Sequence, residues 1–317
     1  MTELFPPLVS IVIPTDKQGS FLAATLQSAL DQTVDNVEIL VANNAPAQES
    51  GKEIAELALK HPCVVVHNFD ELLWPVENLN RSLGLAKGQY VVFLLPGDLL
   101  KPKFLQGCLD IYKIRPDLGY VSCETGTKRI SGQDGDIIHG LDALEDNLLR
   151  CNTRLTPMLM RTQCLREVGG FCYSDIYPVL MMNMKWDVGF SNLELVQSKS
   201  LLGTTTQGFL ENKTLLMSLF LSKIMVMEYY LPDEAMHLKT KKLQVKKQFA
   251  HDCLEHYCLE ALAANNQQLC REYLALAQNF WLGIDKAPAY AFVEQACGRG
   301  GWTLEALQDA WQSEFLV

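Results

Sequence analysis

Polar side chains that could bind a small molecule follow two apolar runs near the start of the chain. Pro14 and Thr15 close the first run, and Asn43 and Asn44 close the second. In an open α/β sheet, the carboxyl ends of parallel strands border the ligand crevice. The sequence therefore predicts a small-molecule site formed by these two strand ends. The alternative is that Asn43 and Asn44 only make a turn, since Asn and the proline soon after them are strong turn formers.

The elements that would position these residues follow a βαβ pattern. The runs 8–15 and 37–44 are rich in Val and Ile and lack alternation, as expected of parallel strands that are buried on both faces. Between them, apolar residues recur at helical spacing from Leu22 to Leu30. Further strands are predicted near residues 64–66, 90–95 and 120–123. The predicted fold class is α/β, with a mostly parallel central sheet.

The same stretch resembles the start of the family-2 inverting glycosyltransferases. The resemblance rests on Val-Ser-Ile-Val-Ile-Pro-Thr, on Asp-Gln-Thr-Val-Asp-Asn-Val-Glu-Ile-Leu-Val, and on the Asn43-Asn44 pair. A later segment, Asn78 to Leu94, is similar to the family's Asn-Trp-Asn-Arg-x-Leu-x-x-Ala-x-Gly-Glu-Tyr-Ile. Several landmarks in the right order are a more specific signal than a lone motif. The resemblance implies a GT-A nucleotide-binding fold and a nucleotide-sugar donor.

The resemblance also implies roles for the strand ends. Pro14 and Thr15 would line the nucleobase pocket, and Asn43 or Asn44 would contact uracil or ribose. The family usually carries Asp-Asp or Asp-Asn at the end of the second strand, so this chain has lost carboxylates there. Asn80, within the similar segment from Asn78 to Leu94, is expected among the nucleotide-binding residues as well.

The family's metal motif, Asp-x-Asp or x-x-Asp-Asp, falls where this chain reads Leu95-Pro96-Gly97-Asp98. Only Asp98 remains as a ligand. One carboxylate plus substrate phosphates can hold Mg²⁺ or Mn²⁺, because such ions keep several waters and use few protein ligands. We expect weak dependence on a divalent cation, or none. The alternative is a turn in which Asp98 caps the next helix.

The family's catalytic base belongs to a Glu-Asp pair after Gly-Gly-Phe. Gly169-Gly170-Phe171 is intact here, and counting back from Lys185-Trp186-Asp187 places Ser174 and Asp175 at the position of that pair. Asp175 is therefore the predicted base that would accept the proton of the acceptor hydroxyl. The alternative is that Asp175 is a helix N-cap, a role that Asp fills well.

Composition limits the possible partners. The chain has 317 residues, with 27 Lys and Arg against 37 Asp and Glu, for a formal charge of -10. This balance argues against nucleic acid, which requires a basic face. Ten cysteines are scattered, mostly in apolar runs, and predict free thiols rather than a disulfide framework. With no signal-like N-terminus, a cytoplasmic location is expected, with the inner face of the membrane as an alternative.

The composition changes near residue 210. We expect residues 1–210 to form the glycosyltransferase-like domain and residues 211–317 to form an all-helical extension. Residues 214–231 predict a buried helix rather than a membrane-surface helix. The lysines that follow predict a solvated face, with anionic lipid headgroups as an alternative partner; they are Lys239, Lys241, Lys242, Lys246 and Lys247. His251, Cys253, His256 and Cys258 cannot converge on one zinc ion from a single helix, so ordinary packing is expected.

These observations favour an enzyme that transfers a sugar from a nucleotide-diphosphate donor, with UDP-sugar expected, to an acceptor with inversion. The acceptor could be a glycan, a lipid or a protein. The alternative is a glycosyltransferase-like binding or scaffold protein that kept the fold and lost catalysis, since carboxylates are missing at three of the family's positions. A weaker alternative is an interaction module whose function lies in the helical extension.

Overall fold

The computed structural model describes residues 6–15, 21–44, 56, 58–124, 136–149, 155–156, 158–197 and 206–315. Contacts divide the chain into two compact units. The first comprises Met1–Asp146 and Asn152–Lys199, and the second comprises Asn147–Cys151 and Ser200–Val317. The boundary at residue 210 stays a prediction.

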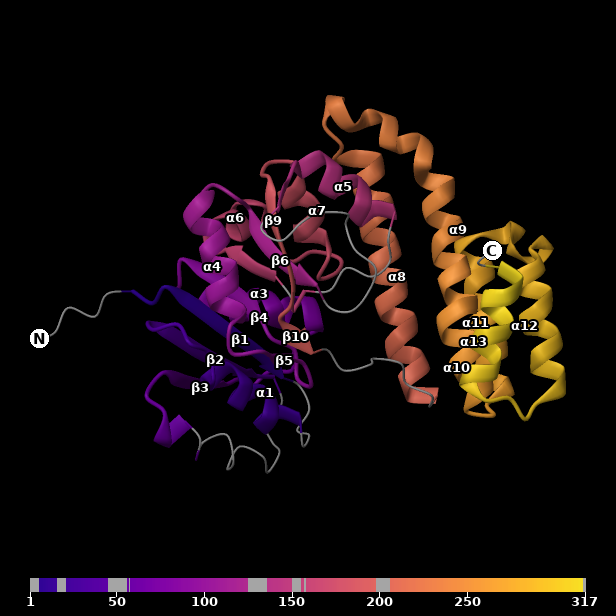
Figure 1. Cartoon of the computed structure of the whole chain (residues 1–317), viewed down its shortest axis with the longest axis horizontal. Coiled ribbons are helices and arrows are strands. Elements are labelled where there is room, and N and C mark those ends of the chain that lie inside the picture. Colours follow the sequence, from indigo (N-terminus) through magenta and orange to yellow (C-terminus); the bar gives the residue numbers. More distant parts are fainter. Residues whose placement is uncertain are drawn as a thin grey trace, which may run out of the picture. The chain divides into compact units, whose positions relative to one another are not determined.

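The first unit is built around a mostly parallel sheet (Figure 1). Within the described residues it has eight strands in the order β3-β2-β1-β4-β8-β6-β9-β7. They are β1 (Val9–Thr15), β2 (Val37–Asn43), β3 (Val64–Asn68), β4 (Tyr90–Phe93), β6 (Tyr120–Glu124), β7 (Asp136–Ile138), β8 (Met158–Arg161) and β9 (Val188–Glu194). Strands β3, β2, β1 and β4 are parallel to one another, which confirms the βαβ prediction. Strand β8 runs antiparallel between β4 and β6.

Helices join the strands of this unit. They are α1 (Phe21–Leu30), α3 (Pro75–Leu85), α4 (Phe104–Ile114), α5 (Gly140–Leu149), which contains the division at Asp146, α6 (Thr162–Glu167) and α7 (Tyr177–Asn183). A short antiparallel pair links β5 (Leu99–Leu100) with β10 (Val196–Gln197). All seven residues of β1 are buried, and the apolar face of α1 covers the same core through Leu22, Leu26 and Ala29. This burial explains why the apolar run of β1 lacks alternation.

The second unit is helical in all of its described elements from residue 206 onward, which confirms the predicted helical extension. They are α8 (Thr206–Tyr229), the 3₁₀ helix η1 (Asp233–Lys241), α9 (Lys242–Asp252), the π-helical turn η2 (Cys253–Cys258), α10 (Leu259–Ala263), α11 (Gln267–Phe280), the 3₁₀ helix η3 (Leu282–Lys286), α12 (Pro288–Arg299) and α13 (Leu304–Phe315). Its core includes the aromatic triangle of Phe220, Phe249 and Phe280, whose ring centroids lie 5.0 to 5.3 Å apart. None of the described helices is both long and apolar enough to span a membrane.

Candidate functional site

The carboxyl ends of β1, β2 and β3 lie side by side. Thr15 pairs with Asn43 across β1 and β2, and Asn43 pairs with Asn68 across β2 and β3. The Asn43 side chain donates a hydrogen bond to the side-chain oxygen of Asn68 at 2.9 Å, and the backbone N–H of Asn44 donates to the carbonyl of Thr15 at 2.7 Å. The structure thus brings together Thr15, Asn43 and Asn44 as the sequence predicts, and their role in nucleotide binding stays a prediction.

The Asn44 side chain is bound to the loop that precedes α3. Its Nδ2 donates to the Leu73 carbonyl at 2.8 Å, and its Oδ1 accepts from the Leu73 N–H at 3.0 Å and from Arg81 at 2.6 Å. Asn44 is 2% exposed. It therefore shapes the loop and anchors Arg81, a role beyond the simple turn weighed for it. The residues 45–50 that follow it lie outside the described residues.

Arg81 is a functional candidate that the sequence reasoning missed. Its guanidinium lies 3.5 Å from the ring centroid of Phe69, and it also donates to Asn78 Oδ1 at 3.0 Å and to the Glu71 carbonyl at 3.3 Å. Burial lowers the pKa of Arg81 from its ordinary value, and the Glu71 carboxylate partly opposes that shift. One signal in the sequence could have identified Arg81. It lies next to Asn80 in the segment that resembles the family, and it is the only basic residue of α3.

Asp98 lies in a turn between β4 and β5 that is bonded to α1. The Thr25 hydroxyl donates to the Asp98 carbonyl at 3.1 Å and accepts from the Gly97 N–H at 2.9 Å. The Thr156 hydroxyl donates to Asp98 Oδ2 at 2.5 Å. Thr156 precedes β8, which runs antiparallel to β4, so Asp98 lies at the carboxyl end of β4. The N-cap of the next helix, α4, is Lys103, so the alternative of Asp98 as its cap is wrong.

A divalent ion fits the chemistry of Asp98, because a carboxylate is a hard oxygen donor and the substrate phosphates would supply others. Among the residues that the structure describes, Asp98 belongs to no group of three or more potential metal ligands. The side chain is 7% exposed and hydrogen-bonded, so it is held in place rather than free to search for an ion. Asp98 as a single protein ligand stays a prediction.

The Gly169-Gly170-Phe171 turn is held against α3 and β4. The Asn80 side chain donates to the Phe171 carbonyl at 2.7 Å and accepts from the Phe171 N–H at 2.8 Å. The Phe171 ring packs edge-on against Phe93, the last residue of β4, with centroids 4.9 Å apart. Both polar ends of the Asn80 amide thus bind this turn. Asn80 fixes the start of the segment that leads to Asp175, whatever further contact it makes with a nucleotide.

Asp175 follows this docked turn, one residue before the N-cap of α7. That N-cap is Ile176, which makes no side-chain cap, and Asp175 Oδ1 is buried without a hydrogen-bond partner. Burial raises the pKa of the Asp175 carboxyl to about 6, although backbone N–H groups of Asp175 and Ile176 oppose the shift. A base with a pKa near the working pH suits proton transfer. Nearby, Tyr173 adopts a φ of 63°, which is uncommon for an aromatic residue.

Trp74 is a surface aromatic beside the segment that begins at Asn78, and it is 74% exposed. It is the N-cap residue of α3, and its backbone N–H donates to the Glu77 side chain at 3.1 Å. An exposed ring at this position could stack on a ligand but is not part of the core.

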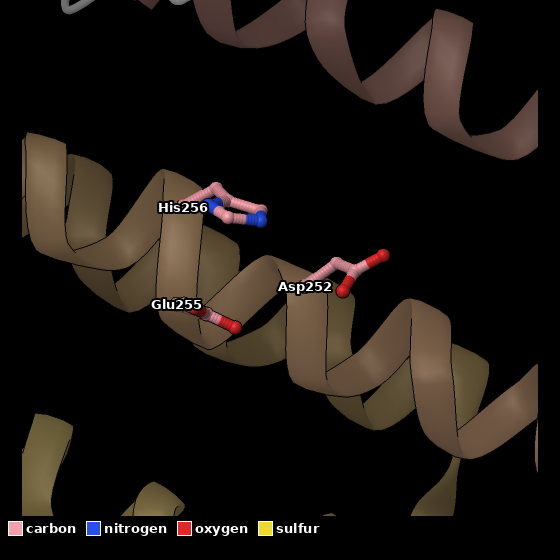
Figure 2. Close-up of side chains that lie close together, drawn as sticks. All are labelled: Asp252, Glu255 and His256. Carbon is pink, nitrogen blue, oxygen red and sulfur yellow. The ribbon is translucent and has the colours of Figure 1, made fainter. Parts of the chain in front are cut away.

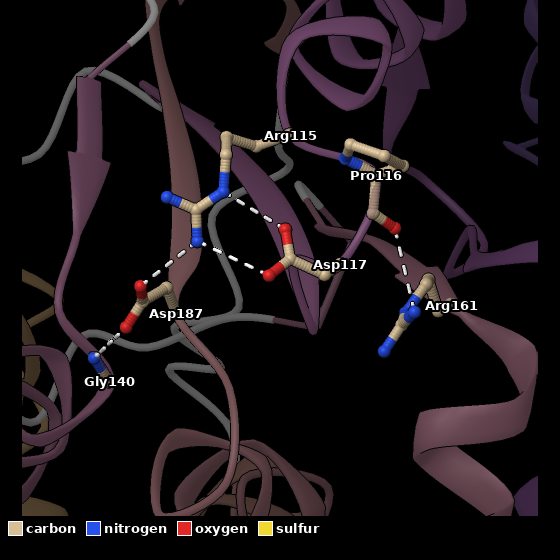
Figure 3. Close-up of polar contacts among 6 residues, drawn as sticks. All are labelled: Arg115, Pro116, Asp117, Gly140, Arg161 and Asp187. Atoms are coloured by element: carbon tan, nitrogen blue, oxygen red, sulfur yellow. Dashed lines mark hydrogen bonds and ion pairs between the residues drawn. The ribbon is translucent and has the colours of Figure 1, made fainter.

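A separate charged network lies at the amino ends of strands β6 and β9 (Figure 3). Arg115 contacts both Asp117 and Asp187, and Asp187 also accepts a hydrogen bond from the Gly140 N–H at 3.1 Å. Arg161 donates to the Pro116 carbonyl at 3.5 Å. Asp117 and Asp187 precede β6 and β9, so they lie at the amino ends of these strands. We interpret this network as structural.

In the helical unit, Asp252, Glu255 and His256 lie close together at the junction of α9 and η2 (Figure 2), and their ligand atoms are all within 4.8 Å of one another. It is the one such group among the described residues. Gln248 already donates to Asp252 at 2.7 Å, and His251 lies 3.8 Å from Glu255. Of the four residues weighed for zinc, Cys253 and Cys258 are buried, and His251 packs edge-on against Trp311.

The fold of the first unit is a mixed α/β fold of the GT-A type. Solved structures share the fold over nearly the whole chain. The mannosyltransferase PcManGT from Pyrobaculum calidifontis, in complex with GDP-Man and Mn²⁺, matches 98% of this chain and 83% of its own with a TM-score of 0.61 at 15% identity. S. aureus TarS 1-349 in complex with UDP-GlcNAc matches 96% of this chain and 91% of its own, with a TM-score of 0.56 at 10% identity.

Sequence comparisons match the first part of the chain. Residues 10–128 match the family model for glycosyl transferase family 2. Chondroitin synthase of Escherichia coli is 27% identical over 133 residues, which are 42% of this chain and 19% of that protein. The putative glycosyltransferase EpsH of Bacillus subtilis is 26% identical over 104 residues, which are 32% of this chain and 30% of that protein. The chain thus spans less than a third of the length of these relatives.

Proposed function

We propose that this protein transfers a sugar from a nucleotide-diphosphate donor to an acceptor hydroxyl with inversion at the anomeric carbon. The observation that carries the proposal is the Asp175 carboxyl, which follows a turn docked on the end of β4 and has a buried oxygen without a hydrogen-bond partner. The match of residues 10–128 to the family model supports the same reaction class.

In the proposed reaction, the oxygen of the acceptor hydroxyl attacks the anomeric carbon from the face opposite the diphosphate. Its proton passes to a carboxylate oxygen of Asp175, and the bond between the anomeric carbon and the phosphate oxygen breaks with its electron pair on the diphosphate. Because burial raises the pKa of the Asp175 carboxyl to about 6, its carboxylate is a stronger base than an ordinary Asp, which favours acceptance of the proton as the bond to the anomeric carbon forms.

The donor would lie at the carboxyl ends of β1 and β2, with Pro14 and Thr15 beside the nucleobase. Arg81 and the Asn43-Asn44 pair would supply hydrogen bonds, and Asp98 would contribute one ligand to a divalent cation. Bound there, such an ion would neutralise charge that develops on the leaving diphosphate. We expect a UDP-sugar as donor and a glycan, lipid or protein as acceptor.

A binding protein without catalysis is the second candidate, and one observation favours it. The side chains of Asn44 and Asn80 are engaged by Leu73, Arg81 and Phe171, so two predicted nucleotide-binding amides already serve the fold.

Calorimetry with UDP and GDP, with and without Mn²⁺, tests the proposal. It is followed by detection of free nucleotide diphosphate after incubation with UDP- and GDP-sugars. An enzyme binds one of the two nucleotides and releases the diphosphate from its sugar donor, and a Mn²⁺ response of that binding reports on Asp98. A binding protein binds the nucleotide but releases nothing from the sugar donor. Absence of binding to either nucleotide would contradict both candidates.

A further inference from the structure

The junction between α8 and α9 exposes apolar side chains beside lysines. Tyr229 and Tyr230 end α8 or follow it, Met236 lies on η1 and Leu243 lies on the first turn of α9. Their exposed fractions are 73%, 40%, 41% and 53%. We call these four residues, together with Lys239, Lys241, Lys242, Lys246 and Lys247, the hairpin surface. Figure 1 shows the junction in orange, where the chain reverses direction from α8 to α9.

Helical spacing aligns the two kinds of side chain. In a 3₁₀ helix, residues three apart lie in one row, so Met236 and Lys239 share a side of η1. On α9, Leu243, Lys246 and Lys247 are three and four residues apart and share one face. Leu243, Lys246 and Lys247 are all exposed, whereas Val245 is buried. The face of α9 that points away from the core therefore carries an apolar residue flanked by cations.

The charge of this segment is opposite to that of the whole protein. The chain has a formal charge of -10, yet five lysines lie between residues 228 and 247 against three acidic residues, Glu228, Asp233 and Glu234. Glu228 is paired with Lys242. Lys247 lies 4.9 Å from the ring of Trp281, a position that holds its charge close to an aromatic surface. An acidic protein is repelled from an anionic surface unless it presents a basic face, and the hairpin surface is such a face.

We propose that the hairpin surface docks the protein on an anionic lipid bilayer. Tyrosine side chains are suited to the boundary between water and acyl chains, because one end of the ring is polar and the rest is apolar. Lysine stems can lie along apolar surface while their ammonium groups contact anionic headgroups. Met236 and Leu243 would enter the boundary between headgroups and acyl chains, as the apolar residues of interfacial helices do.

The arrangement fits a lipid surface better than a nucleic acid or a protein groove. Four exposed apolar side chains have no function against a phosphate backbone, which is bound mainly by cations and polar groups. They are spread over the end of one helix, a 3₁₀ turn and the start of the next helix rather than lining a pocket. A bilayer matches both the apolar and the cationic members.

Flotation of the full-length protein with vesicles tests the proposal. We expect it to float with vesicles that contain phosphatidylserine or phosphatidylglycerol, to stay behind with pure phosphatidylcholine, and to lose binding as salt is raised. The Lys246→Gln/Lys247→Gln variant should bind roughly 10-fold more weakly, since each lysine near an anionic surface adds to the attraction. The matched control, Lys213→Gln/Lys286→Gln, removes the same charge elsewhere in the helical unit and should bind like the parent.

A second pair of variants tests the apolar members. Leu243→Ser should weaken binding, whereas Ile114→Ser, at another exposed aliphatic residue, should not. Binding that is the same for zwitterionic vesicles, equal loss in either control, or preference for RNA over vesicles would overturn the proposal. Release of diphosphate from a soluble donor should be unchanged in all of these variants, so this outcome is independent of the proposed sugar transfer.

Discussion

Arg81 donates a hydrogen bond of 2.6 Å to the side-chain oxygen of Asn44, across 37 residues of sequence. The family whose model matches residues 10–128 usually carries carboxylates at the end of the second strand, where this chain has Asn43 and Asn44. Here the contact joins a cation to a neutral amide, which keeps the hydrogen bond but lacks the attraction between opposite charges. The amide also donates to the Leu73 carbonyl, which a carboxylate could not do.

Replacing Asn44 should therefore affect both stability and binding. Asn44→Ala removes three hydrogen bonds and leaves Arg81 with one partner fewer, so we expect a loss of about 1–3 kcal/mol in the free energy of unfolding. Nucleotide affinity should fall as the loop before α3 loosens. Chemical denaturation and calorimetry with UDP measure the two effects.

Asn44→Asp is the informative comparison for that variant. It restores an ion pair with Arg81 but places a carboxylate oxygen against the Leu73 carbonyl. If the ion pair dominates, this variant is more stable than Asn44→Ala. Equal stability of Asn44→Asp, Asn44→Ala and the parent would show that the contacts of Asn44 do not hold the loop.

The docked turn before Asp175 offers a matched pair of glycine variants. A Cβ at Gly170 would lie 2.5 Å from Asn80 Oδ1, the atom that accepts the Phe171 N–H, and the residue has a φ of 70°. Gly169 has a φ of 89°, but nothing lies within 4 Å of its Cβ position. Both alanine variants are strained, and Gly170→Ala should be less stable by at least about 1 kcal/mol more because it also disturbs the Asn80 contact. Gly170→Ala should also lower turnover. Equal denaturation midpoints for the two variants would show that the contact of Asn80 with Phe171 does not stabilise the turn.

The sequence predicted strands β1, β2, β3, β4 and β6, because each appears as a short apolar run, but it did not predict β7, β8 and β9 of the described sheet. Strand β1 is buried throughout and β2 from Ile39 to Asn43, and both appear as largely apolar runs. The Thr303 hydroxyl, just before α13, accepts a hydrogen bond of 3.2 Å from the Ala306 N–H. A cap such as Thr303 can be recognised from the sequence of the three residues that follow it. Such features follow from neighbouring residues along the chain.

The contacts that shape the site could not be predicted in this way. Thr156 reaches Asp98 across 58 residues, and Asn80 reaches Phe171 across 91. They depend on the antiparallel placement of β8 beside β4 and on the docking of a turn against α3. The orphaned oxygen of Asp175 is likewise a property of the surrounding packing and leaves no pattern in the sequence.

Asp98→Asn should separate charge from position. The amide keeps an oxygen that can accept the Thr156 hydrogen bond, so the fold should be retained, but it lacks the negative charge that attracts a cation. If Asp98 holds the ion, the gain in nucleotide affinity that Mn²⁺ gives should fall by at least about 10-fold. Even the loss of a residue that only supports a metal ligand typically lowers metal affinity by that factor. Calorimetry with UDP at several Mn²⁺ concentrations measures this change.

Thr156→Val is the control, since it removes the hydrogen bond to Asp98 and keeps the carboxylate. It should retain more of the Mn²⁺ effect than Asp98→Asn. An undiminished Mn²⁺ response in Asp98→Asn would remove this residue from the metal site.

Asp175→Asn should slow turnover strongly while making the folded state more stable at neutral pH. Burial raises the pKa of this carboxyl to about 6, above its value in the unfolded chain, so the folded state holds the proton more tightly. The free energy of unfolding therefore decreases as pH rises from about 4 to about 6, and above that range the buried charge costs about 1–3 kcal/mol. An amide carries no charge, so the variant should lose this pH dependence and recover part of that cost.

Turnover needs the deprotonated carboxylate, so the rate of the parent should rise with pH up to about 6 and then level off. The variant should be slower by about 10²–10⁴-fold, with donor affinity unchanged. Denaturation curves at pH 4, 5, 6 and 7, beside a pH profile of diphosphate release, measure both effects. A variant that keeps the parent's turnover would exclude Asp175 as the base, and a variant with the parent's pH dependence of stability would show that another group titrates in this range.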